Sequence, residues 1–135
     1  MKLKENLKDI LETPTEAQEC KIFWKYINLN PILKKYMYHV PNGGFRNKIQ
    51  ALEFQRQGLR AGVSDYHLPY PCNNYLGLWL EMKRKKKNLS KLLTDQKEWL
   101  LNMKELGYAV AIAYGADHAI EIVDQYLNGN LICSI

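Results

Sequence analysis

Asp65 and the triplet Glu81-Met82-Lys83 are the residues of this chain whose types and spacing could do chemistry. Side chains two positions apart on a strand point to the same face of a sheet, so Glu81 and Lys83 would stand together beside Asp65 on a neighbouring strand. Two carboxylates about 4 Å apart repel each other by about 4 kcal/mol at an effective dielectric of about 20. A hard divalent cation with oxygen ligands turns that repulsion into affinity, so the pattern predicts a divalent-metal site.

Lys83 would give such a metal site a positively charged hydrogen-bond donor, which phosphodiester hydrolysis can use. An ammonium group can hold or deprotonate a water and can balance the charge on a pentavalent phosphorane. Two plainer interpretations are open: Glu81 and Lys83 could be a solvated pair on an edge strand, and Asp65 could be a turn residue after Gly62. The triplet alone does not decide between them, because short motifs often match by chance. The order of the surrounding elements favours the site.

Apolar periodicity predicts one α/β domain over residues 1–135, with the element order αβαββαβα. A chain of 135 residues, 47% of them hydrophobic, is long enough to bury a core and too short for a second domain. We expect helices over residues 14–27, 47–57, 90–106 and 116–127, and strands over residues 36–40, 64–68, 76–83 and 108–114. A mixed sheet with helices on both faces would bury every apolar stripe.

The strands over residues 64–68 and 76–83 are predicted to pair as an antiparallel hairpin. Asp65 lies near the start of the first strand and Glu81 near the end of the second, so both side chains should meet at one edge of the sheet. The strand over residues 108–114 follows a long helix, and we expect it to lie parallel to the Glu81 strand through a right-handed crossover.

Thr13 and Pro14 are predicted to begin the first helix, with Glu16 closing a capping box. The stripe that this helix should bury consists of Cys20, Phe23, Trp24 and Ile27. Glu16 lies four residues before Cys20 on the same stripe, where it could bind metal or orient a metal water, although capping explains it almost as well. Glu19 is displaced from the stripe and is expected to be solvated.

Gln96 is polar on the otherwise apolar stripe of the helix over residues 90–106. Burying an unpaired amide costs about 1–3 kcal/mol, so a partner at the site would explain it, and so would a satisfied glutamine in the core. The helix begins soon after Lys83, which should bring Gln96 back over that end of the sheet.

Basic residues exceed acidic ones by 19 to 14, and the resulting net charge of +5 favours a polyanionic partner. The run from Lys83 to Lys87 abuts the proposed metal site and could contact phosphates or form a solvated turn. Arg56 and Arg60 add positive charge near the same loops, and His39 is expected to be a packing or turn residue. The candidate nucleic-acid contacts are Asn42, Arg46, Lys48, Arg84, Lys85, Lys86 and Lys87.

Cys20, Cys72 and Cys133 are odd in number and widely spaced, which indicates neither a zinc motif nor a disulfide framework. The first residues lack an apolar signal-peptide core, and no apolar run reaches membrane-spanning length. We therefore expect a soluble cytoplasmic protein with no membrane contact and no organic cofactor.

Together these residues resemble the VRR-NUC (virus-type replication-repair nuclease) domain of the PD-(D/E)XK nuclease superfamily, over residues 15–127. The resemblance rests on His39-Val40-Pro41-Asn42-Gly43-Gly44, Gly58-x-x-x-Gly62-Val63-Ser64-Asp65, Leu78-Trp79-Leu80-Glu81-Met82-Lys83, Ser90-x-x-x-x-x-Gln96 and Gly107-Tyr108-Ala109-Val110. Ser64 stands where the family usually has proline, which changes backbone stiffness and removes no ligand. The resemblance implies a restriction-endonuclease-like mixed sheet flanked by helices.

The resemblance also implies a site for Mg²⁺ or Mn²⁺, with a role for each residue around it. The implied metal ligands are Asp65, Glu81, the Met82 carbonyl and the first-helix residue Glu16. Lys83 would assist the attacking water, and Gln96 would support Lys83. The small members of this family look like structure-selective DNA nucleases that can dimerise, so a symmetric homodimer is expected.

The expected function is that of a metal-dependent DNA endonuclease in phage or bacterial replication, recombination or repair, acting in the cytoplasm of a bacterial host. One alternative is a non-catalytic nucleic-acid-binding module that uses the same basic face, and a weaker one is a structural subunit of a phage assembly. The combination of Asp65, Glu81 and Lys83 favours the enzyme, because a binding module has no need of paired carboxylates facing phosphate.

Overall fold

The computed structural model describes residues 2–41, 47–133 and 135, and these contain a four-stranded sheet in the order β1-β2-β3-β4. The strands are β1 (Tyr38–His39), β2 (Tyr66–Leu68), β3 (Leu78–Lys83) and β4 (Ala109–Tyr114). β1 pairs antiparallel with β2, β2 pairs antiparallel with β3, and β3 pairs parallel with β4. The mixed sheet, the β2–β3 hairpin and the parallel β4 confirm the predictions made from the sequence.

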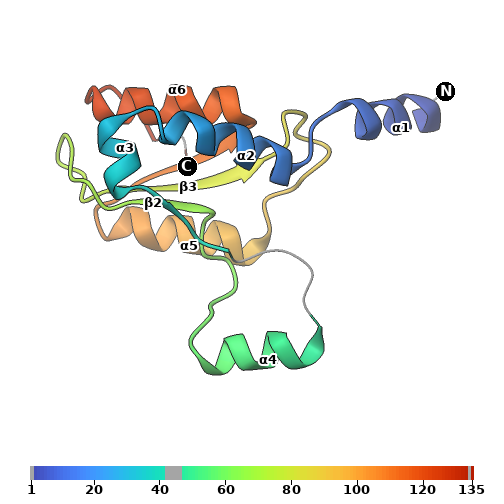
Figure 1. Ribbon diagram of the computed structural model, residues 1–135, viewed down its shortest axis with the longest axis horizontal. Helices are drawn as coiled ribbons and strands as arrows, with labels where there is room; N and C mark the ends of the chain where they lie inside the picture. Colours follow the sequence, from blue (N-terminus) through green and yellow to red (C-terminus); the bar gives the residue numbers. More distant parts are fainter. Residues whose placement is uncertain (1, 42–46, 134) are drawn as a thin grey trace.

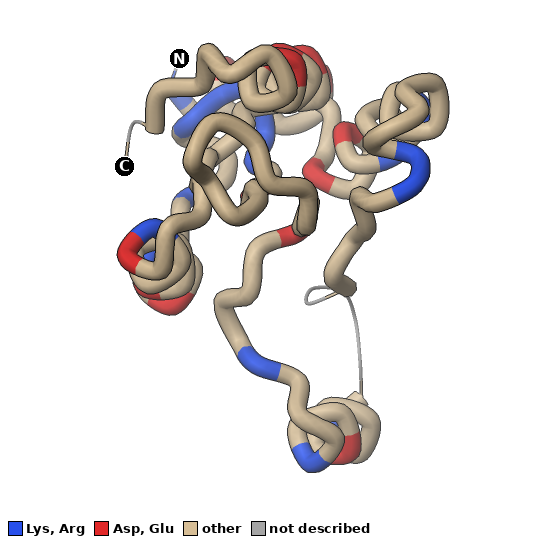
Figure 2. Tube along the Cα trace, turned by 90° about the vertical axis from the view of Figure 1, so that its left-hand side faces the viewer, with Lys and Arg blue, Asp and Glu red and all other residues tan. Residues whose placement is uncertain are grey.

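Helices cover both faces of this sheet (Figure 1). They are α1 (Lys2–Glu12), α2 (Glu16–Ile27), α3 (Pro31–Tyr36), α4 (Lys48–Arg56), α5 (Thr94–Glu105) and α6 (Ala116–Leu127). α2 and α6 lie on one face and α5 lies on the other, whereas α4 stands apart from the sheet in both views (Figures 1 and 2). This arrangement places α2 and α5 on opposite sides of β3.

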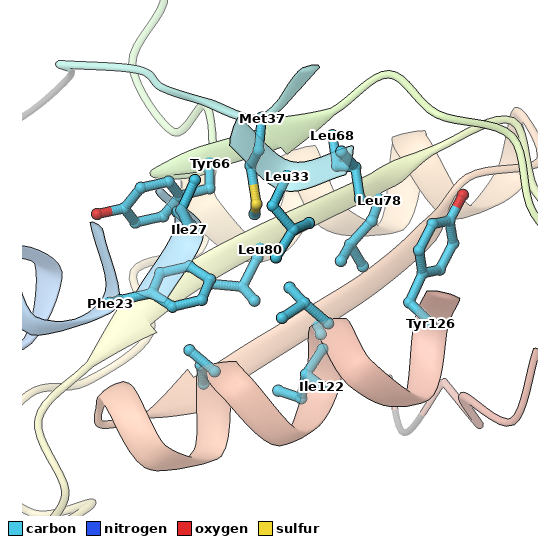
Figure 3. Packing of buried hydrophobic residues seen from close by; sticks show 14 of the residues in the cluster. Phe23, Ile27, Leu33, Met37, Tyr66, Leu68, Leu78, Leu80, Ile122 and Tyr126 are labelled. Atoms are coloured by element: carbon cyan, nitrogen blue, oxygen red, sulfur yellow. The ribbon is translucent and has the colours of Figure 1, made fainter. Parts of the chain in front are cut away.

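Two apolar cores hold these layers together, one on each face of the sheet. In the larger core, Phe23 of α2 and Ile122 of α6 pack in one cluster with Leu80 of β3 (Figure 3). In the smaller core, Leu100 of α5 packs with Trp79 of β3. Every residue of β3 is buried. Leu78, Leu80 and Met82 enter the larger core, whereas Trp79 enters the smaller one and Glu81 and Lys83 alternate with them on its face.

The first predicted helix begins later than expected, at a different capping box. Thr15 is the N-cap: its hydroxyl accepts a hydrogen bond from the Gln18 N–H, and Gln18 Oε1 accepts one from the Thr15 N–H. The carbonyl groups of Thr13 and Pro14 accept hydrogen bonds from the Arg84 guanidinium instead of taking part in a first helical turn. The start predicted at Thr13 is therefore wrong.

The element order is longer than predicted, because α1 and α3 also precede β1. Asn30 caps α3 by accepting hydrogen bonds from the N–H groups of Ile32 and Leu33, and Pro31 takes the first helical position. Both are ordinary helix-start signals that sequence reasoning missed. Because α3 runs to Tyr36, the strand expected over residues 36–40 is shortened to the two residues of β1.

The buried face of α2 differs from the predicted stripe. Trp24, which was expected inside, is 41% exposed, and Glu19, which was expected in solvent, is fully buried. Glu19, Phe23 and Ile27 follow each other at a spacing of four and form the most deeply buried line of the helix. That line leaves Trp24 at the side of α2, where it faces solvent.

The three cysteines, Cys20, Cys72 and Cys133, are free thiols, as expected from their spacing. In the part of the chain that the structure describes, no helix is long and apolar enough to cross a membrane.

Candidate active site

The β2–β3 hairpin brings Asp65 and Glu81 together. The two strands pair Tyr66 with Leu80, so one further step of this register puts Asp65 opposite Glu81. Asp65 Oδ2 accepts a 2.7 Å hydrogen bond from the Met82 N–H, which holds the carboxyl group against the end of β3. Asp65 is therefore more than a turn residue, because its side chain is hydrogen-bonded to the backbone of the neighbouring strand.

The two carboxyl groups share a site in which negative charge is costly. Burial and the charge of Asp65 raise the pKa of Glu81 to about 9, although Lys83 acts to lower it. Burial also raises the pKa of Asp65, although the hydrogen bond from the Met82 N–H favours its charged form. Glu81 Oε2 is buried and has no hydrogen-bond partner among the described residues. A buried oxygen of this kind beside a second carboxyl group is suited to binding a cation.

Lys83 joins three elements at this site. Its side chain is only 4% exposed and lies on the same face of β3 as that of Glu81. Its Nζ is 3.0 Å from Gln96 Oε1 of α5, 3.6 Å from Glu16 Oε1 of α2 and 3.8 Å from Glu81 Oε1 of β3. Glu81 and Lys83 are therefore not a solvated pair on an edge strand, because both are buried on a strand with a neighbour on each side.

Gln96 holds Lys83 from the first turn of α5. Its Oε1 accepts hydrogen bonds from the Lys83 ammonium at 3.0 Å and from the Leu93 N–H at 2.9 Å. Of the two explanations that the sequence left open, the partner at the site is the one observed, since Gln96 is only half-buried and its oxygen accepts from Lys83 and from the start of the helix. Since the Leu93 bond anchors the amide to the helix start, the acceptor that faces Lys83 is held in place.

Glu16 lies near the site, one of the two places that the sequence suggested for it, whereas Glu19 is buried and not solvated as predicted. Glu16 takes no part in capping α2 and instead faces Lys83, with its side chain 43% exposed. Glu19 accepts a hydrogen bond from the Ala116 N–H at the start of α6, and its other oxygen lies 4.0 Å from Lys85 Nζ. A negative charge is favourable at a helix N-terminus, so Glu19 stabilises the packing of α2 against α6.

The model of the VRR-NUC domain matches residues 4–117 of this chain. The chain belongs to the VRR-NUC family. A solved structure described as a VRR_NUC domain protein is 25% identical in sequence and superposes with a TM-score of 0.72, covering 85% of this chain and 89% of the other. No curated protein matches the chain. The family resemblance and the fold predicted from the motifs are thereby confirmed, and VRR-NUC domains are nucleases that generally use divalent metals.

The carboxyl groups of this VRR-NUC domain fit a divalent ion as a pair. Mg²⁺ is usually held by one or two carboxylates, while waters and substrate phosphates complete its shell. Within residues 2–41, 47–133 and 135, no group of three or more His, Cys, Asp and Glu side chains is placed to hold a metal. Asp65 and Glu81 would therefore act with backbone or water oxygens, and the roles of the Met82 carbonyl and of Glu16 as ligands stay predictions.

The basic loop after β3 has partners inside the VRR-NUC domain. Arg84 is half-buried, and its guanidinium donates to the carbonyl groups of Ile10, Thr13 and Pro14. Lys86 pairs with Asp9 of α1, and Lys87 Nζ lies 4.8 Å from the ring centre of Tyr114. The anchoring of the α1–α2 connection by Arg84 was missed in the sequence, and phosphate contacts by the exposed lysines stay predictions.

The other predicted nucleic-acid contacts lie away from this site or outside the described residues. Asn42 and Arg46 belong to the part of the chain that is not described. Lys48 is exposed at the start of α4, a helix that stands apart from the sheet (Figure 1). The structure therefore does not bring Lys48 together with the carboxyl groups.

Replacing Gln96 with leucine is expected to lower the rate of DNA cleavage about 10- to 100-fold, because Lys83 is then without the acceptor that orients it. Gln96→Glu keeps an acceptor oxygen and should retain most of the rate. Single-turnover cleavage at saturating DNA measures the effect, and circular dichroism checks that α5 still folds. Equal rates for Gln96→Leu and the wild type would show that Lys83 does not depend on this hydrogen bond.

Proposed function

We propose that this VRR-NUC domain is a Mg²⁺- or Mn²⁺-dependent DNA endonuclease that selects branched or junction DNA. The observation that carries the proposal is the buried Lys83 ammonium, held by Gln96 and Glu16 beside the Glu81 carboxyl group. A binding module would gain nothing from a lysine withdrawn from solvent next to an unpartnered carboxyl oxygen, since phosphate is bound through exposed charges. Such an arrangement is suited to stabilising the charge that develops at the reacting phosphate of a hydrolase.

Each residue of the site has a place in hydrolysis. A bound Mg²⁺ or Mn²⁺ ion supplies Lewis-acid stabilisation of charge and acidifies water. Asp65 and Glu81 would hold the ion at the end of β3. Lys83 donates one N–H to Gln96, and its ammonium, which also lies beside Glu16 and Glu81, would hold the attacking water and offset charge on the phosphorane.

A panel of linear, flapped and four-way DNAs, incubated with Mg²⁺ or Mn²⁺, tests the proposal. We expect cuts within strands, and faster cleavage of the branched substrates than of the linear duplex. Binding to every DNA without cleavage under either metal would favour the alternative of a non-catalytic nucleic-acid-binding module. Absence of both binding and cleavage would contradict both interpretations.

Neutralising Lys85, Lys86 and Lys87 together is expected to weaken DNA binding for all sequences. Each phosphate that the protein no longer neutralises should reduce the slope of log K against log salt by roughly 0.9 on duplex DNA. All three side chains are exposed on the loop that follows the site, so we expect them to reach phosphates. Fluorescence anisotropy at several salt concentrations measures the slope.

A matched variant removes the same charge from a different surface. Lys2, Lys4 and Lys8 are exposed on α1, and their joint replacement by alanine changes the net charge equally. If both triple variants lower the slope by the same amount, the effect reflects net charge alone. If neither does, the basic loop is a solvated turn.

A homodimer working in bacterial or phage DNA metabolism in the cytoplasm belongs to the same proposal. α1 buries none of its residues, and Leu3, Leu7 and Leu11 leave an apolar stripe exposed along it. A second copy of the chain is the partner that we propose for this stripe. Sedimentation velocity over a range of protein concentrations tests it, and a monomer at every concentration would contradict it.

A further inference from the structure

A groove between α2 and β1 opens directly from the candidate metal site. It has a volume of about 780 Å³, and Glu16 and Asp65 line its inner end. Trp24 and Lys21 line it along α2, while His39 lines it on the β1 side. The groove is therefore continuous with the carboxyl groups and leads away from them along one helix.

The exposed tryptophan is the unusual feature of this groove. Trp24 is 41% exposed, whereas Trp79 is 9% exposed and Trp99 is half-buried. It follows Glu16 by eight residues, so it lies about 12 Å further along the axis of α2. With a rise of about 3.4 Å for each step of one DNA strand, this places Trp24 a few nucleotides from the metal site.

Tyr66 forms an aromatic floor of the groove. Tyr66 is 2% exposed, its hydroxyl donates to the Cys20 carbonyl at 3.3 Å, and its ring meets Phe23 edge-on at 5.0 Å. The exposed His39 ring lies 5.0 Å from the Tyr66 ring. Aromatic groups thus contribute to the floor and to both walls, which suits a flat planar ligand.

Positive charge follows the same edge of α2. Lys21 and Lys25 are exposed, lie four residues apart and so share one side of the helix with Trp24 between them in sequence. Among the residues that the structure describes, no carboxylate forms an ion pair with either lysine. Lysines beside an exposed aromatic ring are the combination that binds single-stranded nucleic acid through phosphates and a stacked base.

We propose that this groove binds an unpaired nucleotide of the DNA substrate, with its base stacked on Trp24 and the adjoining phosphates on Lys21 and Lys25. The inference rests on the proposed nuclease function and narrows its substrate to DNA with a single-stranded segment at the cleavage site. Bases inside a duplex are already stacked on their neighbours, so only an unpaired or displaced base offers a free face to Trp24.

Binding in the presence of EDTA tests the inference separately from cleavage. The probes are an oligothymidylate of about 15 nucleotides, within the usual site size, and a blunt duplex of the same length. We expect the oligothymidylate to quench tryptophan fluorescence in the wild type. Trp24→Leu should abolish this quenching and bind the oligothymidylate about 5- to 150-fold more weakly, as expected for the removal of one stacked base. Its affinity for the duplex should stay unchanged.

Two further variants make the result specific. Trp24→Tyr keeps an aromatic platform and should restore most of the affinity for oligothymidylate. Ile22→Ala removes another exposed apolar side chain of α2, 48% exposed and outside the groove, and should have no effect. Replacing Lys21 and Lys25 by alanine should reduce the salt slope for the single strand by roughly 0.7 for each phosphate that is no longer neutralised.

Several outcomes would overturn the inference. An unchanged affinity of Trp24→Leu for oligothymidylate, or an equal decrease for the duplex, would show that no base stacks on Trp24. If Trp24→Leu alters the oligomeric state and leaves DNA affinity unchanged, the groove contacts a protein instead. In each case cleavage of the DNA panel by the wild type would leave the proposed function standing, whereas a wild type that neither binds nor cleaves DNA would remove both.

Discussion

Replacing Lys83 with methionine is expected to lower DNA cleavage by roughly 100- to 1,000-fold, the usual effect of removing one charged donor from a transition state. Methionine has a similar length and fills the same buried space without a charge or an N–H donor. Affinity for DNA should change little, because a side chain that is 4% exposed contributes few phosphate contacts compared with the exposed lysines nearby. Single-turnover cleavage and anisotropy titration measure the two quantities separately.

The matched control is Lys91→Met, which removes the same charge from an exposed position on the connection between β3 and α5. It should cleave DNA at the wild-type rate. Because Lys83 offsets the charge of buried Glu81, circular dichroism and thermal unfolding must show that the Lys83→Met variant folds. A folded variant that cleaves at a near wild-type rate would remove Lys83 from the mechanism.

Replacing Glu81 with glutamine is expected to abolish Mn²⁺ binding and cleavage while stabilising the metal-free protein. The buried Glu81 carboxyl group lies beside Asp65, and one of its oxygens has no hydrogen-bond partner in the described chain, so its charge opposes folding unless a cation is present. A neutral amide of the same shape removes that cost. We expect the free energy of unfolding in EDTA to rise by about 1–2 kcal/mol, since removing strain from a functional site usually stabilises a protein.

Calorimetry with Mn²⁺ and denaturant unfolding in EDTA measure these two effects. Wild-type protein should be stabilised by added Mn²⁺, and Glu81→Gln should show no such increase. Glu121→Gln is the control, because Glu121 is exposed on α6 and distant in sequence from the hairpin. Equal Mn²⁺ affinity in the wild type and in an Asp65→Ala, Glu81→Ala double variant would place the metal elsewhere.

Local patterns were sufficient to predict the part of the fold that positions the carboxyl groups. The apolar run of β3, the short segment of β2 and the long helix before β4 led to a hairpin and a parallel crossover, and the observed register agrees. Side chains alternate between the two faces of a strand with a period of two. Once the apolar residues of β3 are recognised in the sequence, the shared face of Glu81 and Lys83 is therefore known as well. Helix α6 was likewise predicted with its observed bounds.

Predictions for α2 were less accurate, because its environment is set by residues far away in the sequence. Arg84 holds the carbonyl groups before the helix, which moves the start from Thr13 to the Thr15 capping box. The hydrogen bond between Glu19 and the start of α6 joins positions 97 residues apart. Neither interaction can be recognised from the sequence around α2, because both depend on which elements pack against it in the folded protein.

By itself, the sequence determined which side chains could carry the chemistry, because residue type and strand spacing identify Asp65, Glu81 and Lys83 before any fold is known. Only the tertiary structure decided which of them share one environment and what surrounds them. It buried Lys83 between α2 and α5, and it left Trp24 exposed in the groove that leads away from the carboxyl groups. The physical reason is that neighbours on other elements decide how deeply a side chain is buried. Burial in turn sets the free-energy cost of a charge and the exposure of an aromatic ring, whereas periodicity describes only one element at a time.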